Sequence, residues 1–172
     1  VLVALGACAT IAGVNAMKNL QPIEDVREAV YGEDKYLFPT LPAMPVSAIV
    51  KVDYEVDGCP MSTPEFLKVL KSLLAGQEPI KPDSAVCVEC KLKENECVYD
   101  KGMVCLGPIT KSGCDAICPS FGQFCTGCRG LVSNADKNAM VDILTEHGIT
   151  LDEAKKRILL FNSYKHSQSI PK

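Results

Sequence analysis

The stretch from Cys114 to Cys128, CDAICPSFGQFCTGC, holds four cysteines separated by three, six and two other residues. Four further cysteines precede it, at positions 87, 90, 97 and 105, so that eight of the ten cysteines lie within residues 87–128. Thiols at this density are typical of disulfide frameworks, zinc sites or iron–sulfur clusters. This segment therefore decides the kind of module that the chain contains.

The spacing of the eight cysteines favours iron–sulfur clusters over the two other chemistries. A secreted disulfide framework is short and loop-rich throughout, whereas the flanks of this segment read as ordinary helices. Two zinc sites would use two CxxC pairs each, but only the first and last pairs of the eight have that spacing. Iron–sulfur clusters accept irregular spacing of their cysteine ligands. A ligand is often followed directly by proline, as in Cys118-Pro119. The spacing indicates two [4Fe–4S] clusters, with a zinc-binding structural or assembly module as the alternative.

The composition of the whole chain is that of an ordinary globular protein. Its 172 residues are 47% hydrophobic and 23% charged, with a net charge of −3 and a sequence pI near 5.4. This balance gives no reason to expect a nucleic-acid partner. No apolar run is long enough to span a membrane.

The regions outside the cysteine-rich segment predict an α/β portion and two final helices. We expect a fully buried strand over residues 1–5, a weak helix over 11–19, a helix over 22–30 and a strand over 47–56. Ser62 and Glu65 have capping-box spacing and predict a helix whose apolar face holds several leucines. Two more helices are expected over residues 134–147 and 150–164, the second with a capping box from Thr150 to Glu153.

Five motifs, in this order, resemble the small subunit of [NiFe]-hydrogenases over about residues 1–130. Ala4-Leu5-Gly6-Ala7-Cys8-Ala9-Thr10 and Asp57-Gly58-Cys59-Pro60 are similar to two of that family's proximal-cluster segments. Three further motifs are similar to the cluster-binding half of that subunit. They are Cys105 followed by Leu106-Gly107-Pro108-Ile109-Thr110, then Cys114, and finally Cys125-Thr126-Gly127-Cys128.

The resemblance implies a ligand role for every cysteine. Cys87, Cys90, Cys97 and Cys105 would hold a distal [4Fe–4S] cluster, Cys114, Cys118, Cys125 and Cys128 a medial one, and Cys8 and Cys59 half of a proximal one. The other two proximal ligands would come from a CxxC in an N-terminal segment that precedes Val1 or belongs to another chain. The implied domains are the C-terminal portion of a flavodoxin-like domain (1–78), a ferredoxin-like two-cluster module (79–132) and C-terminal helices (133–172).

The resemblance also implies a function and partners. The chain would relay electrons between a [NiFe]-hydrogenase large subunit, which activates hydrogen, and an electron-accepting subunit. Because it has cysteine at both position 87 and position 118, the chain resembles the small subunits of the cytoplasmic F420-reducing, methyl-viologen-reducing and sulfhydrogenase types. The electron-accepting subunit would use a flavin or F420, would use NAD(P), or would be linked to a heterodisulfide reductase. A free-standing two-cluster ferredoxin is a further alternative, although it would not need Cys8 and Cys59.

The remaining polar and aromatic residues suggest no catalytic group in this chain. The sequence lacks a Gly-rich phosphate loop and paired catalytic carboxylates. We expect Glu89 to be a solvated loop charge, like Glu94 and Glu96, and His147 to lie at a helix end on the surface. Phe121 and Phe124 are expected to shield the medial cluster from water.

Overall fold

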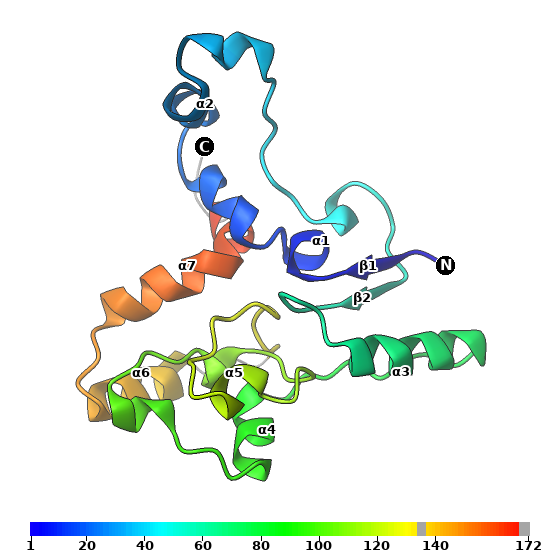
Figure 1. The fold of residues 1–172 in the computed structure, drawn as a ribbon, viewed down its shortest axis with the longest axis vertical. Helices are drawn as coiled ribbons and strands as arrows, with labels where there is room; N and C mark the ends of the chain where they lie inside the picture. The colour runs from blue at the N-terminus through cyan, green and yellow to red at the C-terminus, as the bar shows by residue number, and fades with distance from the viewer. Residues whose placement is uncertain (134–136, 169–172) are drawn as a thin grey trace.

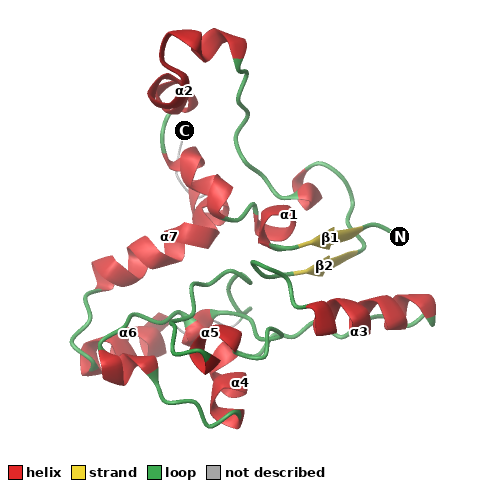
Figure 2. Cartoon of the chain, viewed as in Figure 1, coloured by secondary structure: helices red, strands yellow, loops and turns green. Residues whose placement is uncertain are grey.

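The computed structural model describes residues 1–133 and 137–168 of the chain (Figure 1). It is a mixed, mostly helical fold with a small parallel sheet (Figure 2). The strands and α-helices are β1 (Val3–Leu5), α1 (Ala7–Ile11), α2 (Ile23–Tyr31), β2 (Tyr54–Val56), α3 (Thr63–Leu74), α4 (Val86–Leu92), α5 (Ile117–Ser120), α6 (Lys137–Glu146) and α7 (Leu151–Ser167). Short 3₁₀ segments lie at Val14–Leu20, Gly32–Leu37, Val46–Ala48, Val98–Lys101 and Gly107–Ile109.

The parallel pair β1–β2 brings two distant segments side by side. Val3 pairs with Tyr54 and Leu5 with Val56, so both strands end at the same edge. Beyond that edge the two segments stay hydrogen-bonded, since Ala7 N donates to Gly58 O at 2.8 Å. The predicted α/β character is thus present, and the sheet edge fixes where the loops after the two strands begin.

Two strand predictions were partly wrong, one in the length of the strand and the other in its burial. Residues 46–48 form a 3₁₀ turn, and β2 begins only at Tyr54, because the chain first meets a pairing partner where Asp53 N donates to Leu2 O at 2.9 Å. The strand over residues 1–5 is not fully buried: of β1 only Ala4 is buried. A strand with one neighbour leaves its other edge uncovered.

Helix α3 begins as predicted, but its apolar face is exposed. The Ser62 Oγ accepts a hydrogen bond from Glu65 N at 3.4 Å, which caps the helix. Val69 is buried, whereas Leu74 is 80% exposed. The side-chain spacing therefore predicted the helix correctly, while the described part of the chain covers little of its apolar face.

The main hydrophobic core lies under the cysteine-rich segment, and the C-terminal helices help to form it. The core includes Leu144 of α6 and Ala154 of α7, together with Val86, Val98, Tyr99, Val104, Cys105, Leu106, Ile109, Ala116 and Cys125. Helix α7, capped by Thr150 as predicted, then crosses to the N-terminal half and packs on α1 and the 3₁₀ segment Val14–Leu20 (Figure 1). The predicted start of the preceding helix at residue 134 lies outside the described residues.

The chain offers no membrane-crossing element among its described helices. None of them combines the length and the apolar character that a bilayer span requires.

Candidate functional site

The eight cysteines of residues 87–128 lie around two separate cavities, the larger of which Cys59 also lines, and all ten cysteines are free thiols. The smaller cavity measures about 40 Å³. Its lining contains the first four cysteines of the segment, Cys87, Cys90, Cys97 and Cys105, together with Gly107. Helix α4 supplies the first two of these thiols, and the turns on either side of the 3₁₀ segment Val98–Lys101 supply the others.

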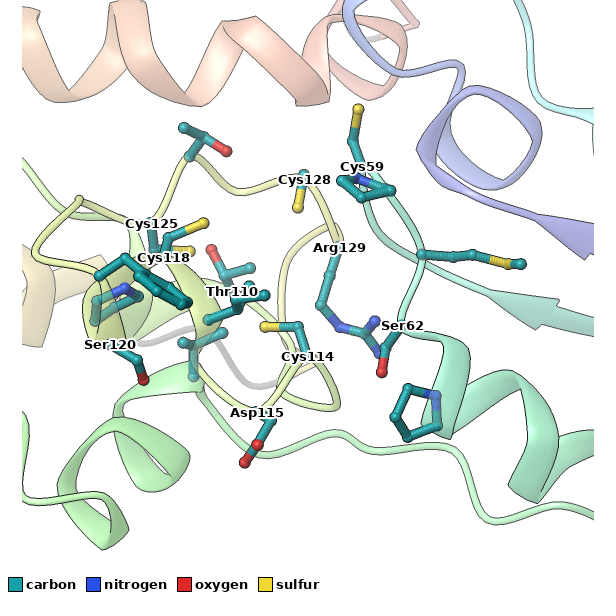
Figure 3. Close-up of a pocket in the computed structure, with 18 of the residues that line it drawn as sticks. Cys59, Ser62, Thr110, Cys114, Asp115, Cys118, Ser120, Cys125, Cys128 and Arg129 are labelled. Carbon is teal, nitrogen blue, oxygen red and sulfur yellow. The ribbon is translucent and has the colours of Figure 1, made fainter.

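The larger cavity measures about 520 Å³ and collects the other four cysteines of the segment. Cys114, Cys118, Cys125 and Cys128 all line it. In Figure 3 the sulfurs of Cys114, Cys125 and Cys128 are directed toward a common space. The structure thus separates the eight cysteines into two groups that are consecutive in sequence rather than interleaved.

Cys8 and Cys59 lie at the shared edge of the two strands. Cys8 is in α1, directly after β1, and Cys59 follows β2 by three residues. Both thiols are exposed. The hydrogen bond from Ala7 N to Gly58 O joins the residues that precede them. The structure therefore brings the two loops together, and the sharing of one cluster by these thiols stays a prediction.

Side-chain amides and backbone N–H groups surround the sulfurs. Asn15 Nδ2 lies 3.6 Å from Cys8 Sγ, and Asn95 Nδ2 lies 3.7 Å from Cys90 Sγ. The N–H of Gly127 faces Cys125 Sγ and opposes the rise in its pKa that burial causes. Donors of this kind orient thiolate ligands and raise the reduction potential of a bound cluster.

Two backbone N–H groups connect one cysteine group to the next. Cys125 N donates to Cys105 Sγ at 3.2 Å, which joins the larger cavity to the smaller one. The N–H of Cys59 faces Cys128 Sγ and opposes the rise in its pKa that burial causes, which joins the larger cavity to the sheet edge. In Figure 3 the Cys59 side chain points away from the sulfurs of the larger cavity, so its backbone, not its thiol, makes this contact.

Burial keeps several of these thiols in the neutral form. It raises the pKa of Cys87 to about 12, and the neighbouring thiols Cys105, Cys90 and Cys97 add to the effect. Burial also raises the pKa of Cys125 to about 12, although the N–H of Gly127 opposes it. A metal that compensates the thiolate charge lets such a buried thiol lose its proton. These sites suit a metal-bound sulfur better than a free reactive one.

The surroundings of the cysteines fit an iron–sulfur cluster. Four thiols line the smaller cavity, and a Cβ added to Gly107 would lie 3.1 Å from Cys87 Sγ and 3.4 Å from Cys105 Sγ. This close backbone approach leaves room around the sulfurs that a side chain would take. Among residues 1–133 and 137–168, no three Cys, His, Asp or Glu side chains are grouped as ligands of a single ion.

Glu89 was wrongly predicted to be a solvated loop charge. Its carboxylate accepts hydrogen bonds from Gly113 N at 2.7 Å and from Ala116 N at 3.1 Å. It also lies 4.0 Å from Cys114 Sγ. Glu89 sits between Cys87 and Cys90 in sequence, so it fastens the helix of the first group to the loop of the second. Its position inside the CxxC was the signal in the sequence that could have indicated this contact.

The aromatic residues and His147 differ in part from expectation. Phe121 lines the larger cavity but is 79% exposed, so it shields little. Phe124 instead carries the Arg157 guanidinium over its ring at 4.0 Å, which ties the segment to α7. His147 follows α6 as expected and stacks on Tyr99, with ring centroids 5.2 Å apart.

Arg129, which directly follows Cys128, was not predicted from the sequence to belong to the site. Its side chain is 2% exposed, and its guanidinium pairs with Glu65 through two bonds of 2.7 and 2.6 Å. The capping-box interpretation of Glu65 had assigned that carboxylate to its own helix and so concealed this partner.

The fold and the site define a cysteine-rich α/β chain whose thiols form separate, connected groups. Residues 1–73 match the family model of the NADH ubiquinone oxidoreductase 20 Kd subunit. Sulfhydrogenase 2 subunit delta of Pyrococcus furiosus is 42% identical over 149 residues, with 84% of this chain and 61% of the relative covered. A vhu-type F420-non-reducing hydrogenase subunit of Methanocaldococcus jannaschii is 30% identical, with 95% of this chain and 68% of the relative covered.

The chain belongs to the family of small electron-transfer subunits of hydrogenases. It spans 61% of the delta subunit and 56% of a further relative, the corresponding vhu subunit of Methanococcus voltae. A solved structure of an NAD+-reducing [NiFe]-hydrogenase is also similar, at 33% identity and a TM-score of 0.39, over 48% of this chain and 53% of that one.

Proposed function

We propose that this chain relays electrons within a [NiFe]-hydrogenase complex, between the large subunit that activates hydrogen and an electron-accepting subunit. The observation that carries the proposal is the series of contacts from one cysteine group to the next. Cys125 N donates to Cys105 Sγ, and the N–H of Cys59 faces Cys128 Sγ, so the three groups follow one another. An iron–sulfur cluster supplies one-electron redox chemistry when it is bound.

The proposal assigns each group a cluster of its own. Cys87, Cys90, Cys97 and Cys105 are proposed to hold a distal [4Fe–4S] cluster, and Cys114, Cys118, Cys125 and Cys128 a medial one. Cys8 and Cys59 are proposed to supply half of a proximal one, completed by a CxxC from an N-terminal segment or another chain. Glycines let the backbone approach the sulfurs, and N–H donors orient them. The flavodoxin-like and ferredoxin-like folds of the two halves are part of this proposal.

The terminal acceptor is proposed to be a property of the partner subunits. The relatives carry names as different as sulfhydrogenase, NAD-reducing hydrogenase and coenzyme F420 hydrogenase. A flavin or F420 subunit, an NAD(P) subunit and a heterodisulfide reductase are all compatible with the cysteine groups of this chain. The complex is proposed to work in the cytoplasm.

Metal analysis and site-directed variants test the proposal. The full-length chain in its native complex, purified without oxygen, should be brown and contain iron and acid-labile sulfide. Cys8→Ser and Cys59→Ser should each alter the same electron paramagnetic resonance signal, while Cys114→Ser should alter a different one. A colourless protein with stoichiometric zinc would favour the structural zinc module instead. A free-standing ferredoxin would retain every cluster signal in the Cys8→Ser and Cys59→Ser variants.

A further inference from the structure

Arg129 makes an unusual set of contacts for a charged side chain. Its Nε donates to Ser112 O at 2.7 Å and lies 3.2 Å from Lys111 O. Its Nη1 donates to Asp57 O at 2.8 Å, and both terminal nitrogens bind the Glu65 carboxylate. The guanidinium is therefore almost fully buried with its donors engaged by carbonyl and carboxylate oxygens.

The backbone carbonyls that Arg129 binds belong to the loops that carry cysteines. Asp57 precedes Cys59 by two residues, and Ser112 precedes Cys114 by two. Arg129 itself follows Cys128 (Figure 3). One planar, five-donor group thus fastens three loops to one another. A lysine ammonium, as a single point of contact, could not reach all three acceptors at once.

The fastened loops meet at the boundary between the sheet edge and the larger cavity. Cys59 lines the larger cavity together with Cys128, although its thiol points out of it, and its N–H faces Cys128 Sγ. Arg129 holds both sides of this contact, since it binds the carbonyl two residues before Cys59 and is covalently next to Cys128. The Arg129 side chain therefore fixes the position of the Cys59 loop relative to the segment Cys114–Cys128.

We propose that Arg129 is a positioning residue that sets the spacing between the cluster at the sheet edge and the cluster in the larger cavity. This inference rests on the proposed function, because it concerns the passage of electrons between those two sites. Arg129 lines the larger cavity, but the role proposed for it is to position the loops and not to act as a ligand. It acts by holding the Cys59 backbone against the Cys128 sulfur.

The Glu65 carboxylate offers a way to separate this role from that of an ordinary buried ion pair. The Glu65 carboxylate binds the guanidinium through two hydrogen bonds and takes no part in the bonds from Arg129 to the Asp57 and Ser112 carbonyls. Glu65→Gln removes the charge pair and leaves the Asp57 and Ser112 carbonyls bound to Arg129. Arg129→Met removes all of these bonds, and Arg129→Lys keeps the positive charge without the planar donor geometry.

The experiment measures the magnetic interaction between the two clusters in the reduced, full-length protein in its native complex. The splitting of their electron paramagnetic resonance signals depends steeply on the distance between the two spins. We expect Arg129→Met and Arg129→Lys to lose this splitting and Glu65→Gln to retain it, with the same iron and sulfide content. Should Arg129→Met fail to fold, Arg129→Lys decides the question with the same readout.

Two results would overturn the inference while leaving the proposed function intact. One is an unchanged splitting in either Arg129 variant at full iron content. The other is an equal loss of splitting in Glu65→Gln, which would assign the effect to the ion pair. A parent protein without iron would overturn the proposed function first, and the inference with it. The iron assay therefore distinguishes the two failures before any spectrum of a variant is compared.

Discussion

Gly113 lies so close to Arg129 that a Cβ on the glycine would come within 2.4 Å of the guanidinium Nη2. It would also lie 2.8 Å from the Glu65 Oε1, and the backbone at this glycine has a φ of 109°, a value that side-chain-bearing residues rarely adopt. The buried pair and the loop before Cys114 are thus packed with no room for a methyl group.

We expect Gly113→Ala to reduce the free energy of unfolding by roughly 3 kcal/mol, the sum of backbone strain and overpacking. Gly122→Ala is the matched control, because Gly122 also has a positive φ, of 72°, but a Cβ placed there would meet nothing within 4 Å beyond its own chain neighbours. That control should lose only about 1 kcal/mol from the backbone strain. Thermal unfolding of the two variants under nitrogen gives the comparison, and equal midpoints would contradict the packing argument.

Gly107→Ala should disturb the smaller cavity and leave the larger one intact. The new methyl group would press on Cys87 Sγ and Cys105 Sγ, and the φ of Gly107 is not positive, so close approach is the main cause of any effect. We expect altered signals or partial iron loss at the distal site alone. Redox titration followed by electron paramagnetic resonance checks this, and a change confined to the medial signals would refute it.

Cys118→Pro should convert the medial cluster to a three-iron form with a higher potential. Cys118 lies in the first turn of α5, where proline is tolerated, and it lines the cavity with the other three thiols of its group. Loss of one corner ligand should release one iron. The oxidised variant should then show a new three-iron signal, and an unchanged spectrum would mean that Cys118 is not a ligand.

Glu89→Gln should raise the reduction potential of the medial cluster. Burial first, and then the charge of this carboxylate, raises the pKa of the Cys114 thiol. The same negative charge disfavours an added electron, so its removal should shift the midpoint upward by on the order of tens of millivolts. Glu96→Gln is the control, since Glu96 pairs with Lys101 on the surface, with an Nζ–Oε2 distance of 2.7 Å. A downward shift in Glu89→Gln would contradict the assignment.

The grouping of the cysteines and the capped helices could be predicted from the sequence. Local rules act over a few residues, so Ser62 and Thr150 predicted the starts of α3 and α7 correctly. The resemblance implied that the first four and the last four cysteines of the segment form two sets, and the structure places these two sets on separate cavities. Which cluster each group binds stays a prediction.

The features that the sequence did not reveal depend on contacts between distant segments. The strand expected over residues 47–56 is limited to Tyr54–Val56 because its pairing partner is only three residues long. Arg129 and Glu65 are 64 positions apart, and the pattern around each gave no sign of the other. Glu89 was wrongly predicted because a carboxylate in a charged stretch is usually solvated, whereas here two N–H groups from another loop bind it.

The connections between the cysteine groups are made by main-chain N–H groups, at Cys125 and at Cys59. Every residue except proline carries such a donor, so most substitutions leave it in place. Side chains around the sulfurs can therefore be substituted one at a time while the main-chain contacts between the cysteine groups stay in place.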